Sequence, residues 1–171
     1  MRGPGGTWGF ILAATLVCSP ASLLTARAAQ DEIAAYQARF EHEKNPVHKA
    51  KMMQSLGAAE FEEIEKDVNE GNLADAVKIL DQYRDEARFC VEGLDAKQID
   101  AAKHSSGFKQ LQISLQEALR RLGQILPALT GDQQPPFLAV RTDLLEMNDH
   151  LVHELFPDTP AGNPPAEKDT P

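Results

Sequence analysis

The sequence predicts an all-α protein, and three observations favour that fold class. From Asp31 onward, no segment alternates polar and apolar residues with the period of two that a half-buried strand requires. No Asn-Gly or Asp-Gly pair stands where a β-hairpin would turn. Apolar residues instead recur at the three- and four-residue spacing of amphipathic helices. We expect an antiparallel bundle of four long helices plus one short N-terminal helix, with a solenoid of helical hairpins as the alternative.

Residues 1–28 have the features of a signal peptide. Arg2 precedes an apolar stretch from Trp8 to Cys18, and Ala26-Arg27-Ala28 matches the A-x-A pattern that signal peptidases cleave. The apolar stretch is too short and too interrupted to span a bilayer stably, so a retained anchor is the weaker alternative. We therefore expect a periplasmic or secreted protein, cleaved near Ala28 and without stable membrane insertion afterwards.

The first two predicted helices flank Pro46. Ile33, Tyr36 and Phe40 mark the short first helix, which should end before Pro46 because a residue preceding proline avoids the helical conformation. Asn45 then acts as the N-cap of the second helix, with Pro46 at the first helical position. This helix should run to about Glu70 and stop at Gly71, and its inward residues are Met53, Leu56, Phe61, Ile64 and Val68.

Three more helices and a tail complete the predicted domain, 29–156. Asn72 should cap the third helix, which turns inward Leu73, Ala76, Val77, Leu80, Ala87, Val91 and Leu94. A loop is expected over 93–106, and Ser105 or Ser106 should cap the fourth helix, which buries Phe108, Leu111, Leu115, Leu119, Leu122, Leu126 and Leu129. After a break at 130–136, the fifth helix buries Phe137, Val140, Leu144, Leu151 and Leu155. Residues 157–171 hold five prolines and no apolar periodicity, which predicts a disordered tail.

Charge and cysteine content exclude several classes of interaction. The chain has a net charge of −9, and removing residues 1–28, which hold Arg2, Arg27 and no acid, makes it −11. So acidic a protein repels phosphate backbones, which excludes nucleic acid as a partner. Cys90 is the one cysteine outside the predicted signal, so it is either buried or available for an intermolecular disulfide.

The candidate metal ligands lie on the predicted fifth helix. His150 and His153, with Glu146 and Glu154, have a spacing that brings side chains to one helical face, and such a group can bind a metal. The H-E-x-x-H pattern of zinc peptidases and the Glu-x-x-His pair of di-iron bundles are both absent from the sequence. A solvated polar face is therefore the favoured interpretation of these four residues.

No other cluster in the sequence predicts catalysis. The acidic run on the second helix, Glu60, Glu62, Glu63, Glu65 and Asp67, is interpreted as a solvated face, because carboxylates do acid–base work only where burial separates their pKa values. Haem, phosphate-loop and serine-hydrolase motifs do not occur in the sequence. We expect a protein that is not an enzyme and needs no cofactor.

Two short segments carry resemblances to known families. The segment Gly71-Asn-Leu-Ala-Asp-Ala-Val-Lys-Ile-Leu80 resembles part of a tetratricopeptide repeat, although no second copy follows at an interval of about 34 residues. The segment Leu129-Thr-Gly-Asp-Gln133 resembles the Leu-Thr-x-x-Gln motif of small helical periplasmic chaperones that respond to envelope stress. In physical terms Thr-x-x-Gln is a capping box, in which the two side chains satisfy each other's exposed N–H groups.

As a whole the chain is similar to uncharacterised exported helical proteins of bacteria. The similarity rests on Asn45-Pro-Val-His-Lys-Ala-Lys51 and Pro135-Pro-Phe137, near equivalent helix starts, and it implies no activity. We therefore expect an exported non-enzymatic protein that binds another envelope or secreted protein or has a structural role. A chaperone-like stress protein and a metal-binding bundle are the alternatives, and the oligomeric state stays open.

Overall fold

The computed structural model describes residues 21–157, and the side chains of 31–157. This part of the chain is all-α and contains no strand: the helices are α1 (Ala21–His42), α2 (Pro46–Glu70), α3 (Leu73–Ala96), α4 (Ser105–Ile125) and α5 (Gln134–Leu155), with a short 3-10 helix, η1 (Leu126–Ala128). The all-α prediction is confirmed. Most of the predicted signal peptide and of the predicted tail lies outside the described residues.

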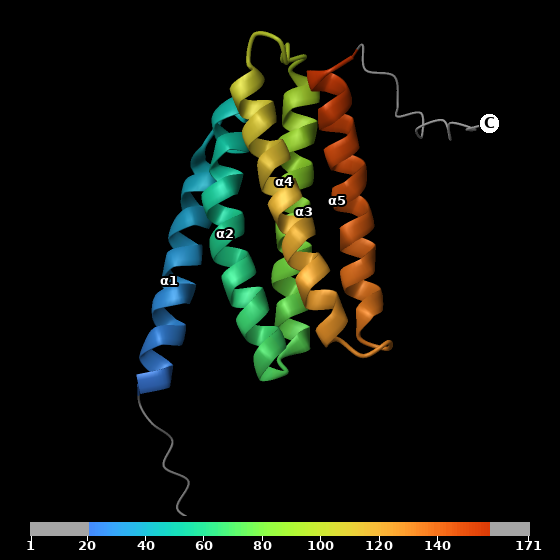
Figure 1. Cartoon of the computed structure of the whole chain (residues 1–171). Coiled ribbons are helices and arrows are strands. Elements are labelled where there is room, and N and C mark those ends of the chain that lie inside the picture. Colours follow the sequence, from blue (N-terminus) through green and yellow to red (C-terminus); the bar gives the residue numbers. More distant parts are fainter. Residues whose placement is uncertain (1–20, 158–171) are drawn as a thin grey trace, which may run out of the picture.

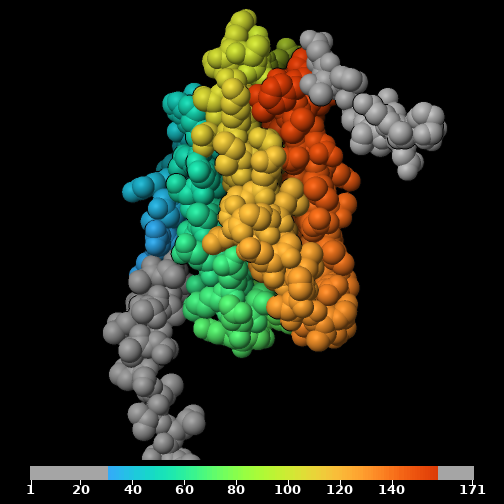
Figure 2. Space-filling model, viewed as in Figure 1, coloured from blue at the N-terminus to red at the C-terminus, as the bar shows by residue number. Residues whose placement is uncertain are grey.

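The bundle consists of two helical hairpins packed face to face (Figure 1). The α2–α3 hairpin packs against the α4–α5 hairpin, with α2 against α4 and α3 against α5, so that α3 and α4 lie on a diagonal with little contact. Consecutive helices run in opposite directions, and the 97–104 connection crosses from α3 to α4 at one end of the bundle. In the space-filling view, α4 fills the face between α2 and α5 (Figure 2). The hairpins thus close a bundle and do not form a solenoid.

Helix α1 packs on the outside of this four-helix unit, against α2. It ends at His42, before Pro46, as predicted. It begins at Ala21 and has 22 residues, whereas the apolar spacing alone predicts a start near Asp31. The predicted cleavage point after Ala28 therefore falls within α1, and cleavage there would leave 29–42 as the short N-terminal helix.

The ends of α2 follow the predicted local chemistry. The Asn45 side chain accepts hydrogen bonds from the N–H groups of Val47 and His48, at 2.9 and 3.3 Å. Gly71 ends the helix with φ +82°, a left-handed conformation that favours glycine, and its N–H caps carbonyl groups of the last turn. Asn72 differs from the prediction: it stands at the N-cap position of α3, but its side chain makes no cap hydrogen bond and donates to Glu70 at 3.3 Å.

The connection between α3 and α4 is shorter than the predicted loop. Helix α3 continues through Gly93 to Ala96, because Leu94 is buried and keeps this turn against the bundle. The loop is organised by Asp100, whose carboxylate accepts from the N–H of Ala102 at 2.8 Å. The cap position of α4 is His104, without a side-chain cap bond, so the prediction that Ser105 or Ser106 caps this helix is wrong.

The predicted apolar stripes form the core. Leu115 and Leu122 are fully buried at its centre, and Cys90 is 1% exposed, so the buried alternative for this cysteine holds. Six stripe residues at the margins are half-buried: Val68, Leu73, Val77, Leu119, Leu126 and Leu155. The core thus matches the predicted faces of all four long helices.

One polar contact ties three helices together inside this core. The buried Tyr83 hydroxyl of α3 donates to the carbonyl oxygen of Ser114 on α4 at 3.2 Å, and the Ser114 hydroxyl donates to the carbonyl of Met53 on α2 at 3.1 Å. Gly57 makes room for the tyrosine ring, since a Cβ atom at this position would lie 2.6 Å from Tyr83 Cε2. Gly57 therefore permits the close approach of α2 and α3.

Candidate functional site

The acidic run of α2 does not form a solvated face throughout. Glu62 is exposed as expected, but Glu60 is fully buried, and Glu63 and Asp67 are 5% and 7% exposed. Their spacing places these three carboxyl groups on one side of α2, and α1 covers that side. The Gln37 amide of α1 donates to Glu60 Oε1 at 3.3 Å. The interpretation as a solvated face is therefore wrong for these three residues.

Glu60 and Glu86 of α3 form a carboxyl pair, in which each group shifts the pKa of the other. One oxygen of each group has a partner, Gln37 for Glu60 and Gln82 for Glu86, the latter at 3.0 Å. The other oxygen of each, Oε2, is buried without a hydrogen-bond partner among the described side chains. Two carboxylates cannot satisfy each other, but a carboxyl group that carries a proton donates to its neighbour, and one shared proton satisfies both.

Burial and mutual repulsion keep that proton in place. Burial raises the pKa of Glu60 to about 9, and the negative charge of Glu86 adds to the rise. Burial also raises the pKa of Glu86, against the opposing effect of its hydrogen bond from Gln82. Glu60 is therefore neutral near pH 7, and its hydrogen bond to Glu86 lets the second group accept.

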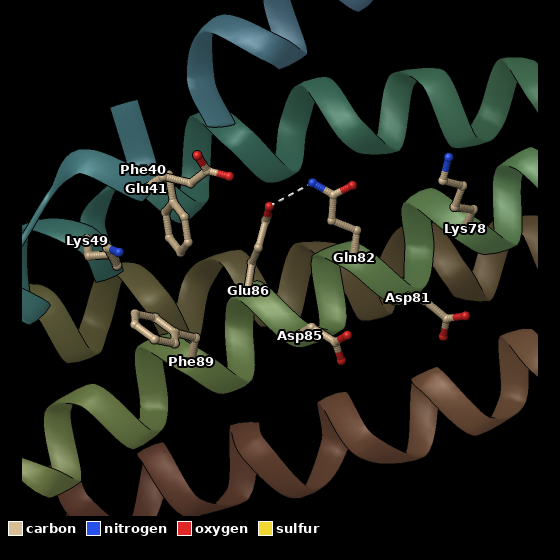
Figure 3. Close-up of a pocket in the computed structure, with 9 residues that line it drawn as sticks. All are labelled: Phe40, Glu41, Lys49, Lys78, Asp81, Gln82, Asp85, Glu86 and Phe89. Carbon is tan, nitrogen blue, oxygen red and sulfur yellow. Dashed lines mark hydrogen bonds between the residues drawn. The ribbon is translucent and has the colours of Figure 1, made fainter. Parts of the chain in front are cut away.

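An open cavity of about 650 Å³ lies next to this pair, between α1, the start of α2 and α3. We call it the α1–α3 groove and define it by Phe40, Glu41, Lys49, Lys78, Asp81, Gln82, Asp85, Glu86 and Phe89 (Figure 3). In Figure 3, the hydrogen-bonded Gln82 and Glu86 lie on its α3 wall, with Phe40 and Phe89 toward one end. The groove thus combines one member of the buried pair with aromatic surface.

Lys49 fixes the aromatic end of the groove. Its Nζ atom lies 4.7 Å from the ring centre of Phe40 and 4.6 Å from that of Phe89. Lys49 itself is only 8% exposed, whereas Phe89 is 56% exposed. An ammonium group held against ring faces gains a cation–π attraction, which orders both rings. Phe89 is therefore a large aromatic side chain that is ordered and yet open to solvent.

Two acids of the groove, Asp81 and Asp85, are paired. Arg84 contacts Asp81 at 2.7 Å and Asp85 at 3.0 Å. Arg88 reaches Asp143 of α5 at 2.9 Å, which links the outer edge of α3 to the second hairpin. Among the described residues, neither Glu41 nor Lys78 makes an ion pair, so Glu41 is a free carboxylate at the mouth of the groove and Lys78 a free cation on its α3 wall.

The four candidate metal ligands on α5 separate in the structure. His150 is half-buried, and its Nε2 atom lies 3.0 Å from a carboxylate oxygen of Asp95 on α3. His153 and Glu154 are exposed and line the same cavity as His150, of about 590 Å³, but Glu146 is exposed elsewhere on the helix. Within the described part of the chain, no three His, Cys, Asp or Glu side chains come close enough together to hold a metal ion.

The predicted capping box at Thr130 forms only in half. The Gln133 side chain accepts from the N–H of Thr130 at 2.9 Å, as in a capping box. The Thr130 hydroxyl, however, donates to the Asp132 carboxylate instead of capping α5. Pro135 and Pro136 follow in the first turn, where their missing N–H groups need no partner.

Comparisons with protein-family models, curated proteins and solved structures found no significant match. Across the described residues, no helix combines the length and the apolar character needed to cross a membrane.

The sequence contained a signal for the buried pair. Glu60 lies four residues after Leu56 and four before Ile64, so it falls on the apolar stripe of α2. Lys49 similarly lies four residues before Met53. Helical periodicity therefore predicts burial at both positions, whereas residue type predicts exposure, and the structure follows the periodicity.

Proposed function

We propose that this is an exported, non-enzymatic helical protein that binds another envelope or secreted protein in the α1–α3 groove. The observation that carries the proposal is Phe89, an exposed aromatic ring held in place by Lys49 beside an open cavity. Ordered aromatic side chains of this kind contribute much of the affinity at protein interfaces, because little conformational entropy is lost when they bind. The nine residues that line the groove include no Ser, Cys, His or Tyr, and Glu60, the member of the carboxyl pair whose pKa is raised to about 9, is not among them, which supports binding over catalysis.

The proposed occupant is a segment with an apolar side chain flanked by a basic group. The apolar side chain would pack on Phe89, and the basic group would pair with Glu41, the free carboxylate at the groove mouth. The net charge of −9 favours the approach of such a segment. Among the described residues, the other large exposed apolar side chains are Ile113 on α4, Leu138 and Leu145 two turns apart on α5, and Phe156 at the end of α5, and none of them lines the groove. This distribution favours a single groove over the broad surface that a chaperone-like role requires.

The test is crosslinking of the tagged protein in its own cell envelope, followed by identification of the captured protein. Phe89→Ala should reduce the yield of that partner several-fold. Phe156→Ala is the matched control, because Phe156 is equally exposed, at 54%, but lies at the end of α5 and away from the groove. A circular dichroism spectrum should show that both variants keep their helices. Equal capture by Phe89→Ala and the wild type would exclude the groove as the binding site.

A further inference from the structure

We propose that the Glu60–Glu86 pair is a proton-controlled latch that holds α1 against the bundle and releases it as the pH rises. Because α1 forms one wall of the α1–α3 groove and carries Phe40 and Glu41, release would remove that wall and with it the carboxylate proposed to pair with the partner. The claim that the latch regulates partner binding rests on the function proposed above. The release of α1 itself can be measured without any partner.

The packing makes α1 the part that can move. Helices α2 to α5 each contact two neighbours in the closed bundle, whereas the principal contacts of α1 are with α2. Glu60 bonds to Gln37 of α1, and Glu63 and Asp67 line a cavity together with Ile33, Ala34 and Gln37, so this contact is rich in carboxyl groups. Gln37 bonds directly to Glu60, and Glu86 reaches the groove wall from α3. The pair therefore lies where α1, α2 and the groove meet.

No positive charge compensates the pair. On α1, the facing charged group is Glu41, which is also acidic. On α2, Glu63 pairs with Lys66 at 2.7 Å, and Lys49 lies between Phe40 and Phe89. On α3, Asp85 pairs with Arg84, and Tyr83 and Cys90 are buried. Lys78 and Asp81 line the same groove, but Lys78 is eight residues before Glu86, about 12 Å along the helix. From α4, Arg121 pairs with Glu65 at 3.1 Å, and Ser114 bonds to Tyr83. A second negative charge in the pair would therefore be unpaired as well as buried.

The direction of the effect follows from where the proton is held more tightly. With α1 in place, the pKa of Glu60 is raised to about 9 from its ordinary value of 4.5. Release of α1 would take the Gln37 amide away from Glu60 Oε1 and let water reach the carboxyl group. The closed form binds the proton more tightly, so raising the pH favours the open form. Between these two pKa values the equilibrium for release rises by up to about tenfold per pH unit. Above the higher value it levels off.

Hydrogen–deuterium exchange of the full-length protein, read by mass spectrometry, tests the latch. Peptides of α1 from 31–42 are compared between the wild type and Glu60→Gln at about pH 6 and about pH 8.5, within the window given by the two pKa values. Glutamine keeps the shape of the protonated acid and its donor to Glu86 but does not titrate. The intrinsic exchange rate of an amide depends on pH. Because this dependence is the same in both proteins, it cancels when the wild type and Glu60→Gln are compared at the same pH.

Between the two pH values, we expect the protection of α1 in the wild type to fall at least tenfold relative to that in Glu60→Gln. A change of about tenfold is well below the largest change that proton linkage allows over this pH interval. Helix α4 should show no such difference. Glu62→Gln is the matched control, since Glu62 is exposed on the same helix, and it should follow the wild type. Equal protection of α1 in wild type and Glu60→Gln at both pH values would overturn the latch.

A second measurement separates this inference from the proposed function. Capture of the crosslinked partner is compared at the same two pH values in the wild type and Glu60→Gln. A yield of captured partner that changes with pH in the wild type but not in Glu60→Gln supports control of the groove by the latch. If capture by both proteins is equally indifferent to pH while α1 is released, control of binding is overturned. If Phe89→Ala leaves the yield of captured partner unchanged while α1 is still released as the pH rises, the proposed function fails and the latch itself stands.

Discussion

At the scale of single residues, Gly57 shows how one missing side chain sets a helix spacing. Its Cα faces the Tyr83 ring, and the tyrosine hydroxyl reaches Ser114 across the core. A longer side chain on α2 would push the ring away and break the contact among three helices. Such a glycine has a structural reason that outweighs its low helix propensity.

Gly57→Ala should therefore destabilise the protein, although alanine is the better helix former by about 1 kcal/mol. The added methyl group would overlap the Tyr83 ring, and relieving the overlap requires a shift of α2 or of the buried phenol. Gly123→Ala is the control, since a Cβ atom there meets nothing within 4 Å inside α4. Urea denaturation should show a lower midpoint for the first variant and a higher one for the second. A higher midpoint for both would contradict the packing argument.

Leu115 and Leu122 supply a second residue-scale prediction. Both are fully buried on α4, so truncation to alanine should lower the free energy of unfolding by about 2–5 kcal/mol at each site. Ile113→Ala, at a side chain that is 45% exposed on the same helix, should cost much less. Chemical denaturation measures all three, and a cost below about 1 kcal/mol at both leucines would mean that the opposite face is inward.

The sequence predicts these leucines but not Glu60, for a physical reason. Apolar residues at helical spacing have one low-energy location, the core, so pattern and residue type agree. A carboxyl group at the same spacing has two low-energy locations: it can lie in solvent, with that face of the helix exposed, or it can be buried in its neutral form beside a hydrogen-bonding partner. Whether Glu60 is exposed or buried depends on Gln37 and Glu86, which are distant in sequence and reach Glu60 only once the helices pack.

At the scale of helices, Asn45 and Asn72 have the same residue type and position but different bonds. Asn45→Ala should lower the free energy of unfolding by about 0.5–2 kcal/mol, because the side-chain oxygen caps two N–H groups of α2. Asn72→Ala should cost distinctly less, because that side chain makes no cap bond to α3. Thermal unfolding of the two variants compares them directly. An equal loss at both positions would show that capping is not what distinguishes them.

Both ends of α2, which depend on local chemistry, were predicted, whereas the end of α3, which depends on packing, was not. Asn45 and Gly71 act through hydrogen bonds to their own helix, and Pro46 acts through its fixed φ angle, so all three effects are local to the sequence. The end of α3 instead follows the burial of Leu94 against other helices, so Gly93 does not stop it. The order of packing in the bundle is likewise absent from the stripes, because an apolar face does not encode which neighbour it meets.

At the scale of the whole molecule, the carboxyl pair predicts how stability depends on pH. The folded pKa of Glu60 is raised from 4.5 to about 9, so the folded state binds the proton more tightly, and the free energy of unfolding falls as pH rises between these values. Burial raises the pKa of Asp67 too, with the same sign. Thermal midpoints measured from about pH 5 to about pH 9 should decline in the wild type. Glu60→Gln should flatten the decline, and Glu62→Gln should leave it; a profile that rises with pH would contradict the burial of a neutral Glu60.

The face-to-face arrangement of the hairpins has a consequence for assembly. The main contacts between the hairpins are those of α2 with α4 and of α3 with α5. Within one chain, only the 97–104 connection joins the two hairpins. Two copies that exchange their α4–α5 hairpins would form the same contacts between chains, and an exchange of this kind costs little when the connection extends. Deleting residues from 97–104 should prevent the crossing within one chain and favour an intertwined dimer. Size-exclusion chromatography with light scattering would detect the doubled mass, and a shortened chain that remains a folded monomer would show that the crossing needs fewer residues.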